Sequence, residues 1–142
     1  MKTLRTYIFI FATIACLSWL FGCTYSRTYS PELNDKAKSI SDSIDSKYHF
    51  EAINLTGKAT SGTSGKHATL TIQFVNGQNI PTDTSQMKAL AKQLAIEVKK
   101  AIKDTTRFDG YVVGFDTRKT DGDVTSNNFY DFDFTPDDLK AQ

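Results

Sequence analysis

Strict alternation of apolar and polar side chains in one short stretch constrains the fold of this chain more than any other feature. Residues 68–74 read Ala-Thr-Leu-Thr-Ile-Gln-Phe, so their apolar and polar side chains fall on opposite sides of an extended chain. This pattern is typical of a strand that buries one face and exposes the other. The same period of two predicts three further strands, over residues 48–59, 108–115 and 128–135.

Two other stretches repeat their apolar side chains at helical spacing. The first covers residues 30–46 and begins with a serine cap, followed by a proline at the first helical position. The second runs over residues 83–103, where Gln86 stands three positions after Asp83, as in a capping box. Each helix has one apolar face, so each needs a surface on which to pack.

These elements follow one another in the order α-β-β-α-β-β. With 142 residues, the chain has room for one domain and little more. We therefore expect a single small α+β domain over residues 31–142, with a four-stranded, mainly antiparallel sheet and both helices packed on its apolar face. A short turn at 61–65 would join the first two strands, and a long polar loop at 116–127 would join the last two.

The polar face of this sheet is the candidate binding surface. Asp131 and Asp133 share one side of the last strand with Phe129. Paired carboxylates can perform acid–base catalysis, but such a pair more often lies on the solvent side of a sheet. A surface phenylalanine beside threonines and aspartates suits a binding patch. The candidate binding residues are Thr69, Thr71, Gln73, Phe129, Asp131 and Asp133.

No motif in the sequence predicts catalysis. The chain lacks the GxSxG, HExxH and CxxC patterns and any phosphate-cradling glycine loop. Its only histidines, His49 and His67, have no acidic cluster at metal-ligand spacing, so we expect them on the surface or at strand ends. We expect no catalytic residue, no cofactor and no enzymatic activity.

The aspartate-rich segment around residue 120 resembles part of a calcium-binding loop. Oxygen-bearing side chains occupy positions 1, 3, 5 and 7 of such a loop: Asp121, Asp123, Thr125 and Asn127. Its positions 6 and 12 need glycine and glutamate but hold Ser126 and Phe132, and the flanks are strand-like. We therefore predict no metal site there; a looser site that adds Asp116 is the alternative.

The second helix carries a row of lysines opposite its apolar face: Lys88, Lys92, Lys99 and Lys103. At 100° per residue these side chains fall on one side of the helix. They form either an ordinary solvated helix face or a contact for anionic lipid or polysaccharide phosphates.

The N-terminus has the pattern of a secretory signal peptide. Lys2 and Arg5 precede an uncharged apolar run over residues 7–21. A run of this length is near the upper limit for a signal-peptide core, whereas a membrane-spanning helix needs roughly 20 residues.

The end of this run, Leu20-Phe21-Gly22-Cys23, resembles the lipobox of bacterial lipoproteins, although Phe21 is bulkier than usual. The resemblance implies a signal peptide over residues 1–22, cleavage before Cys23 and attachment of lipid to its thiol, which anchors the chain in a membrane. Residues 23–30 would then be the lipidated cysteine and a polar tether. The alternatives are a conventionally cleaved signal peptide and an uncleaved anchor.

The residue after the cysteine bears on location in a cell with two membranes. An aspartate there would imply retention in the inner membrane, whereas this chain has Thr24. The resemblance therefore favours the outer membrane, facing the periplasm. Cys16 would leave with the signal peptide, so the mature chain would contain no internal disulfide.

The charge balance narrows the choice of partners. Without residues 1–22 the chain has 15 basic and 16 acidic residues, a net charge of −1, which gives no basis for nucleic-acid binding. We expect a non-enzymatic, lipid-anchored envelope protein that binds another envelope component, most simply a protein. The alternative is an inhibitor or immunity-type lipoprotein that neutralises a toxin or hydrolase. The C-terminal part is acidic, with nine aspartates and three basic residues between Asp104 and Asp138, and its 116–138 region could meet a basic enzyme.

Overall fold

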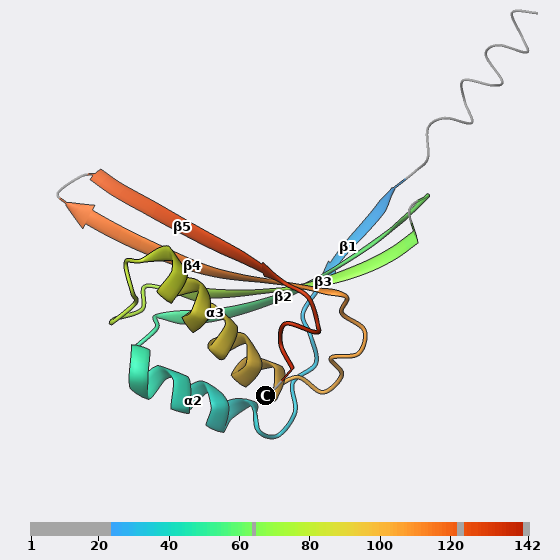
Figure 1. The fold of residues 1–142 in the computed structure, drawn as a ribbon, viewed down its shortest axis with the longest axis horizontal. Helices are drawn as coiled ribbons and strands as arrows, with labels where there is room; N and C mark the ends of the chain where they lie inside the picture. The colour runs from blue at the N-terminus through green and yellow to red at the C-terminus, as the bar shows by residue number, and fades with distance from the viewer. Residues whose placement is uncertain (1–23, 64, 122–123, 141–142) are drawn as a thin grey trace, which may run out of the picture.

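The computed structural model describes residues 24–63, 65–121 and 124–140, which form one mixed sheet and two helices (Figure 1). The strands are β1 (Tyr25–Tyr29), β2 (Ala52–Gly62), β3 (Gly65–Val75), β4 (Gly110–Asp121) and β5 (Val124–Phe134). The helices are α2 (Ala37–Tyr48) and α3 (Thr84–Lys99). The strands lie side by side in chain order; β3 and β4 are parallel and the other neighbours are antiparallel. The α+β class is confirmed, but the sheet is five-stranded and mixed.

The extra strand is β1, which forms where the sequence predicted a tether. It pairs with the outer end of β2, from Tyr25 opposite Ser61 to Tyr29 opposite Gly57. The Tyr29 ring covers Gly57 so closely that a Cβ at Gly57 would lie 2.6 Å from it. The first strand of the sheet therefore begins at Tyr25, ahead of residue 31. Most side chains of β1 are exposed, so its sequence has no alternation of apolar and polar residues that would predict a strand.

The first helix also begins later than its serine–proline signal predicts. Leu33 forms a β-bridge with Ile102, and the Asn34 N–H donates to the carbonyl of Ala101 at 2.9 Å. These bonds tie the segment after β1 to the end of α3, so neither segment is helical there. Helix α2 consequently starts at Ala37, and α3 ends at Lys99.

Two hairpins extend from the centre of the sheet in opposite directions (Figure 1). Only residues 69–75 of β3 pair with 110–116 of β4. Because these strands are parallel, the β2–β3 turn and the β4–β5 turn lie at opposite ends of the shared region. The predicted polar loop at 116–127 is thus mostly the outer part of the β4–β5 hairpin. It has no apolar face to bury, which explains why the sequence reads as a loop.

Both helices cover one face of the sheet, as predicted (Figure 1). Leu70, Ile72 and Phe74 of β3 lie at the centre of this core and are fully buried. The Phe74 ring packs against those of Phe50 and Phe115, with centroids 4.8 and 5.7 Å away. From α3, the core receives Met87, Leu90, Ala91, Leu94, Ala95 and Val98.

Local hydrogen bonds fix the ends of these elements. The predicted cap of α3 is confirmed, since the Gln86 N–H donates to Asp83 Oδ1 at 2.9 Å. A second turn follows β5: the Thr135 N–H donates to Asp138 Oδ2 at 2.8 Å, and the Asp138 N–H donates back to Thr135 Oγ1. This turn places Leu139 in the core. The Thr135 N–H and the Thr135 hydroxyl both donate to Asp138 Oδ2 and hold the pKa of Asp138 below its ordinary value, aided by the charges of Lys92 and Lys88.

Candidate functional site

The six residues predicted to bind a partner all lie on the sheet face that the helices leave open. Their side chains alternate with the buried ones of β3 and β5, which face the helices. The register sets Thr71 and Asp133 on either side of Val112, and Gln73 and Asp131 on either side of Gly114. Thr69 lies beside Gly110, and Phe129 beside Asp116. The central strand β4 therefore separates the two groups.

Small residues of β4 form the floor between these two groups. Gly110, Val112 and Gly114 face the open side, by the same alternation. A Cβ at Gly114 would lie 2.5 Å from Asp131 Oδ1, so the Asp131 carboxylate leans across the central strand. Neither Asp131 nor Asp133 makes an ion pair with any residue in the described part of the chain. The face thus presents two uncompensated carboxylates above a shallow floor.

An exposed aromatic residue stands at one end of this face. The Phe129 side chain is 58% exposed, whereas its cross-strand neighbour Asp116 is only 3% exposed. Arg118 donates to Asp116 Oδ2 through Nη2 at 3.3 Å, and the other oxygen has no hydrogen-bond partner within the described ranges. The burial of Asp116 is not predictable from the sequence, because it depends on the strand pairing that sets Val75 and Phe129 on either side of it.

The geometry of β4 argues against the looser calcium site. Asp116 and Asp121 are five residues apart in an extended strand, a separation of roughly 17 Å at about 3.4 Å per residue. Asp123 lies outside the described residues, and the described ones contain no group of three His, Cys, Asp or Glu side chains placed to hold a metal.

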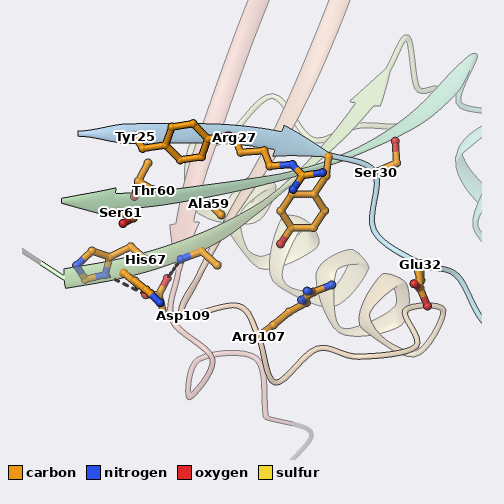
Figure 2. A pocket seen from close by; sticks show the side chains of 13 residues that line it. Tyr25, Arg27, Ser30, Glu32, Ala59, Thr60, Ser61, His67, Arg107 and Asp109 are labelled. Carbon is orange, nitrogen blue, oxygen red and sulfur yellow. Dashed lines mark hydrogen bonds and ion pairs between the residues drawn. The ribbon is translucent and has the colours of Figure 1, made fainter. Parts of the chain in front are cut away.

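A groove lies on the other face, beyond the reach of the helices (Figure 2). It has a volume of about 640 Å³ and is bounded by β1, the outer parts of β2 and β3, and the loop between α3 and β4. The floor of the groove is formed by β2, whose residues opposite the groove-lining side chains of β1 are all small: Gly57, Ala59 and Ser61. We refer to this feature as the β1–β3 groove. Its lining residues are Tyr25, Arg27, Tyr29, Ser30, Glu32, Ala59, Thr60, Ser61, Lys66, His67, Ala68, Arg107 and Asp109.

Three cationic side chains line the β1–β3 groove without an anionic partner. Arg27, Lys66 and Arg107 form no ion pair with any described residue. The Arg107 guanidinium instead lies over the Tyr29 ring, 5.4 Å from its centroid. Tyr25 is 66% exposed at the outer end of the groove.

The two acidic residues of the groove have other partners. Asp109 lies 2.9 Å from His67 Nδ1 and accepts a hydrogen bond from the Ala68 N–H at 3.0 Å, as Figure 2 shows in part. Glu32 binds Lys103 Nζ at 3.4 Å. The groove therefore has an excess of positive charge. The groove is not predictable from the sequence, because its cations are distant along the chain and come together only when β1 pairs with β2.

The predicted lysine row is not a free cationic surface, and its last member, Lys103, lies beyond the end of α3 at Lys99. Lys99 Nζ lies 5.1 Å above the Tyr111 ring and donates to the Leu139 carbonyl. Burial, and then the charge of Lys140, lower the pKa of Lys99. Lys103 pairs with Glu32. Intramolecular contacts thus occupy half of the row, which leaves the other sites as the stronger candidates.

Residues 1–23 lie outside the described part of the chain, so lipidation of Cys23 stays a prediction. None of the described helices is long and apolar enough to cross a membrane. Comparison of the chain with protein-family models, with curated proteins and with solved structures found no match. Function must therefore be inferred from the two faces of the sheet.

Proposed function

We propose that this chain is a lipid-anchored envelope protein whose small domain binds a basic segment of another envelope protein. The open face of the sheet is the binding surface, and no catalysis is involved. The observation that carries this proposal is the pair of carboxylates on β5, Asp131 and Asp133, which lack ion-pair partners among the described residues. A partner with lysine or arginine side chains would neutralise them.

The shape of the face favours an extended partner segment. The floor of small β4 residues runs between the Thr71 and Gln73 side of β3 and the aspartate side of β5. Polar side chains on one wall can donate and accept hydrogen bonds, while the other wall supplies negative charge. Phe129, 58% exposed, offers an apolar contact at one end.

The proposed anchor restricts where the partner can be. If lipid is attached to Cys23, Thr24 alone separates it from the first residue of β1. The domain would then lie against the membrane surface, without the polar tether that the sequence suggested. We place it on the outer membrane, facing the periplasm, and expect a partner that is itself close to that membrane.

The same pair of carboxylates supports a second candidate function. A toxin or hydrolase that acts on anionic substrates has a basic cleft, and an acidic sheet face could block it. An inhibitor of this kind would protect cells challenged with the enzyme. A structural or adaptor protein would not show such a phenotype.

Affinity capture from the native host tests the proposal. The full chain and its Asp131→Asn/Asp133→Asn variant are tagged at the C-terminus, crosslinked in intact cells and purified. We expect one dominant protein with the native chain and a loss of about tenfold or more with the variant, since a charge-assisted contact contributes roughly 1.5–3 kcal/mol. Asp42→Asn is the matched control, because Asp42 is an exposed carboxylate on α2. Equal capture by all three proteins would contradict the proposal.

A further inference from the structure

We propose that the β1–β3 groove binds an anionic saccharide, that is, a sugar ring that carries phosphate or carboxylate. This inference goes beyond the protein-binding function, because the groove is lined from the helix side of β1 and shares none of the six predicted binding residues of the open face. It stands on the charge, the shape and the aromatic lining of the groove.

The charge of the groove calls for an anion. Ser61 of β2 lies between Tyr25 of β1 and Lys66 of β3. The next residue inward on this face is Ala59 of β2, which lies between Arg27 of β1 and Ala68 of β3. Arg27 and Lys66 therefore border the same floor of small β2 side chains. Arg107 approaches from the facing loop (Figure 2). Arg27, Lys66 and Arg107 outnumber the two carboxylates of the groove, Glu32 and Asp109, and a bound anion would offset the remaining repulsion between the cations. Arginine suits phosphate and carboxylate in particular, because its planar fork can donate two hydrogen bonds to either.

The size and lining of the groove suit a ligand larger than an inorganic anion. About 640 Å³ falls within the roughly 300–1,000 Å³ of small-molecule sites. The exposed Tyr25 ring supplies a flat apolar surface against which the C–H face of a sugar can pack. Hydroxyl groups of Ser30 and Ser61, which can both donate and accept, match the hydroxyls of a sugar ring.

Such a ligand has two sources, a free saccharide or the headgroup of a glycolipid. The groove opens at Tyr25, the first residue of β1, which lies two positions after Cys23. A lipid at Cys23 would bring the groove to the bilayer, where a glycolipid headgroup is accessible. The chemistry recognised is the same in both cases, so the experiment separates the sources by how the sugar is presented.

Calorimetric titration of the full chain in neutral detergent tests the proposal. The probes are glucose 6-phosphate and glucuronate, with glucose and inorganic phosphate as controls. We expect both anionic sugars to bind and glucose not to. Lys66→Gln should weaken binding about tenfold or more, since it removes a charged hydrogen-bond donor. Lys38→Gln should leave it unchanged, because Lys38 is an exposed lysine on α2.

A second variant separates a saccharide site from a simple anion site. Tyr25→Ala changes an exposed side chain, so the melting temperature should not change. The affinity for glucose 6-phosphate should fall severalfold relative to the affinity for inorganic phosphate, because the sugar loses its contact with the ring. Reconstitution in phosphatidylcholine vesicles with a phosphorylated glycolipid addresses the source. Weaker binding of free glucose 6-phosphate in these vesicles than in phosphatidylcholine alone would assign the groove to the glycolipid; unchanged binding would assign it to a free sugar.

Three results would overturn the proposal. These are no binding of either anionic sugar at millimolar concentration, equal binding by the native chain and Lys66→Gln, and equal effects of Tyr25→Ala on sugar phosphate and inorganic phosphate. The Asp131→Asn/Asp133→Asn variant should bind glucose 6-phosphate normally, because those residues lie on the opposite face. Failure of one proposal can therefore be told apart from failure of the other.

Discussion

Substitution of Gly57 by alanine, with and without Tyr29, tests whether β1 is folded onto the sheet. A Cβ at Gly57 would lie 2.6 and 2.7 Å from two carbons of the Tyr29 ring, so the ring must move. That movement disrupts the stacking of Tyr29 on Phe108, whose centroids are 6.4 Å apart, and the contact with Arg107. These contribute about 0.5–1.5 and about 0.5–1 kcal/mol, respectively.

Alanine itself is favourable in a strand. Relative to glycine it stabilises a strand interior by roughly 0.5–1 kcal/mol, because the unfolded chain has less freedom to lose. The net effect of Gly57→Ala is therefore a loss of about 0–2 kcal/mol in the native chain, with a midpoint near about 1 kcal/mol. In a Tyr29→Ala background there is no ring to displace, so the same substitution should stabilise the protein.

Urea denaturation followed by far-ultraviolet circular dichroism measures both effects. With a slope of about 1–3 kcal/mol per molar urea, a loss of 1 kcal/mol lowers the midpoint by roughly 0.3–1 M. We expect a decrease in the native background and an increase in the Tyr29→Ala background. An increase in both backgrounds would refute the packing of Tyr29 on Gly57, and with it the pairing of β1 with β2.

Three further predictions concern the core and the caps. Phe74→Ala should cost about 3–5 kcal/mol in urea denaturation, because the ring is fully buried, whereas Phe129→Ala should stay within about 0.5 kcal/mol; similar losses for both would contradict the assigned burial. Asp83→Ala should cost about 1 kcal/mol and Asp83→Asn much less, since asparagine also caps a helix; equal losses would show that the cap contributes nothing. The pKa of Asp138 is lowered in the folded state, first by the Thr135 N–H, so its carboxylate stabilises the fold above the ordinary value of 3.8 and loses this effect as the pH falls through the lowered pKa. Asp138→Asn should therefore be less stable than the native chain near neutral pH and equal to it in strong acid; a difference independent of pH would exclude this linkage.

Segments with one buried face were predictable from the sequence. The alternation around Leu70 and Ile72 correctly predicted a half-buried strand, and the Asp83 cap correctly predicted where α3 begins. Both signals are local, because side-chain period and capping depend on neighbouring residues. The same alternation put the six candidate binding residues on one side of the sheet.

Segments without a buried face were not predictable. Most side chains of β1, and those of residues 125–129 in β5, are exposed, so these stretches carry no apolar period. Their strand structure comes from pairing with β2 and with β4, respectively. The parallel pairing of β3 with β4 follows from the crossover through α3, which returns the chain in the same direction. The β1–β3 groove depends on the pairing of β1 with β2, so it was not predictable from the sequence either.

A photo-crosslinking amino acid at position 129, incorporated in living host cells, tests the central claim most directly. Phe129 is exposed on the open face next to Asp131, whereas an identical substitution at Ser43 reports on the solvent side of α2. The proposed function predicts one discrete protein adduct from position 129 that disappears when Asp131 and Asp133 are changed to asparagine, and none from position 43. The same adducts from both positions, or an adduct from position 129 that survives the loss of both carboxylates, would contradict it.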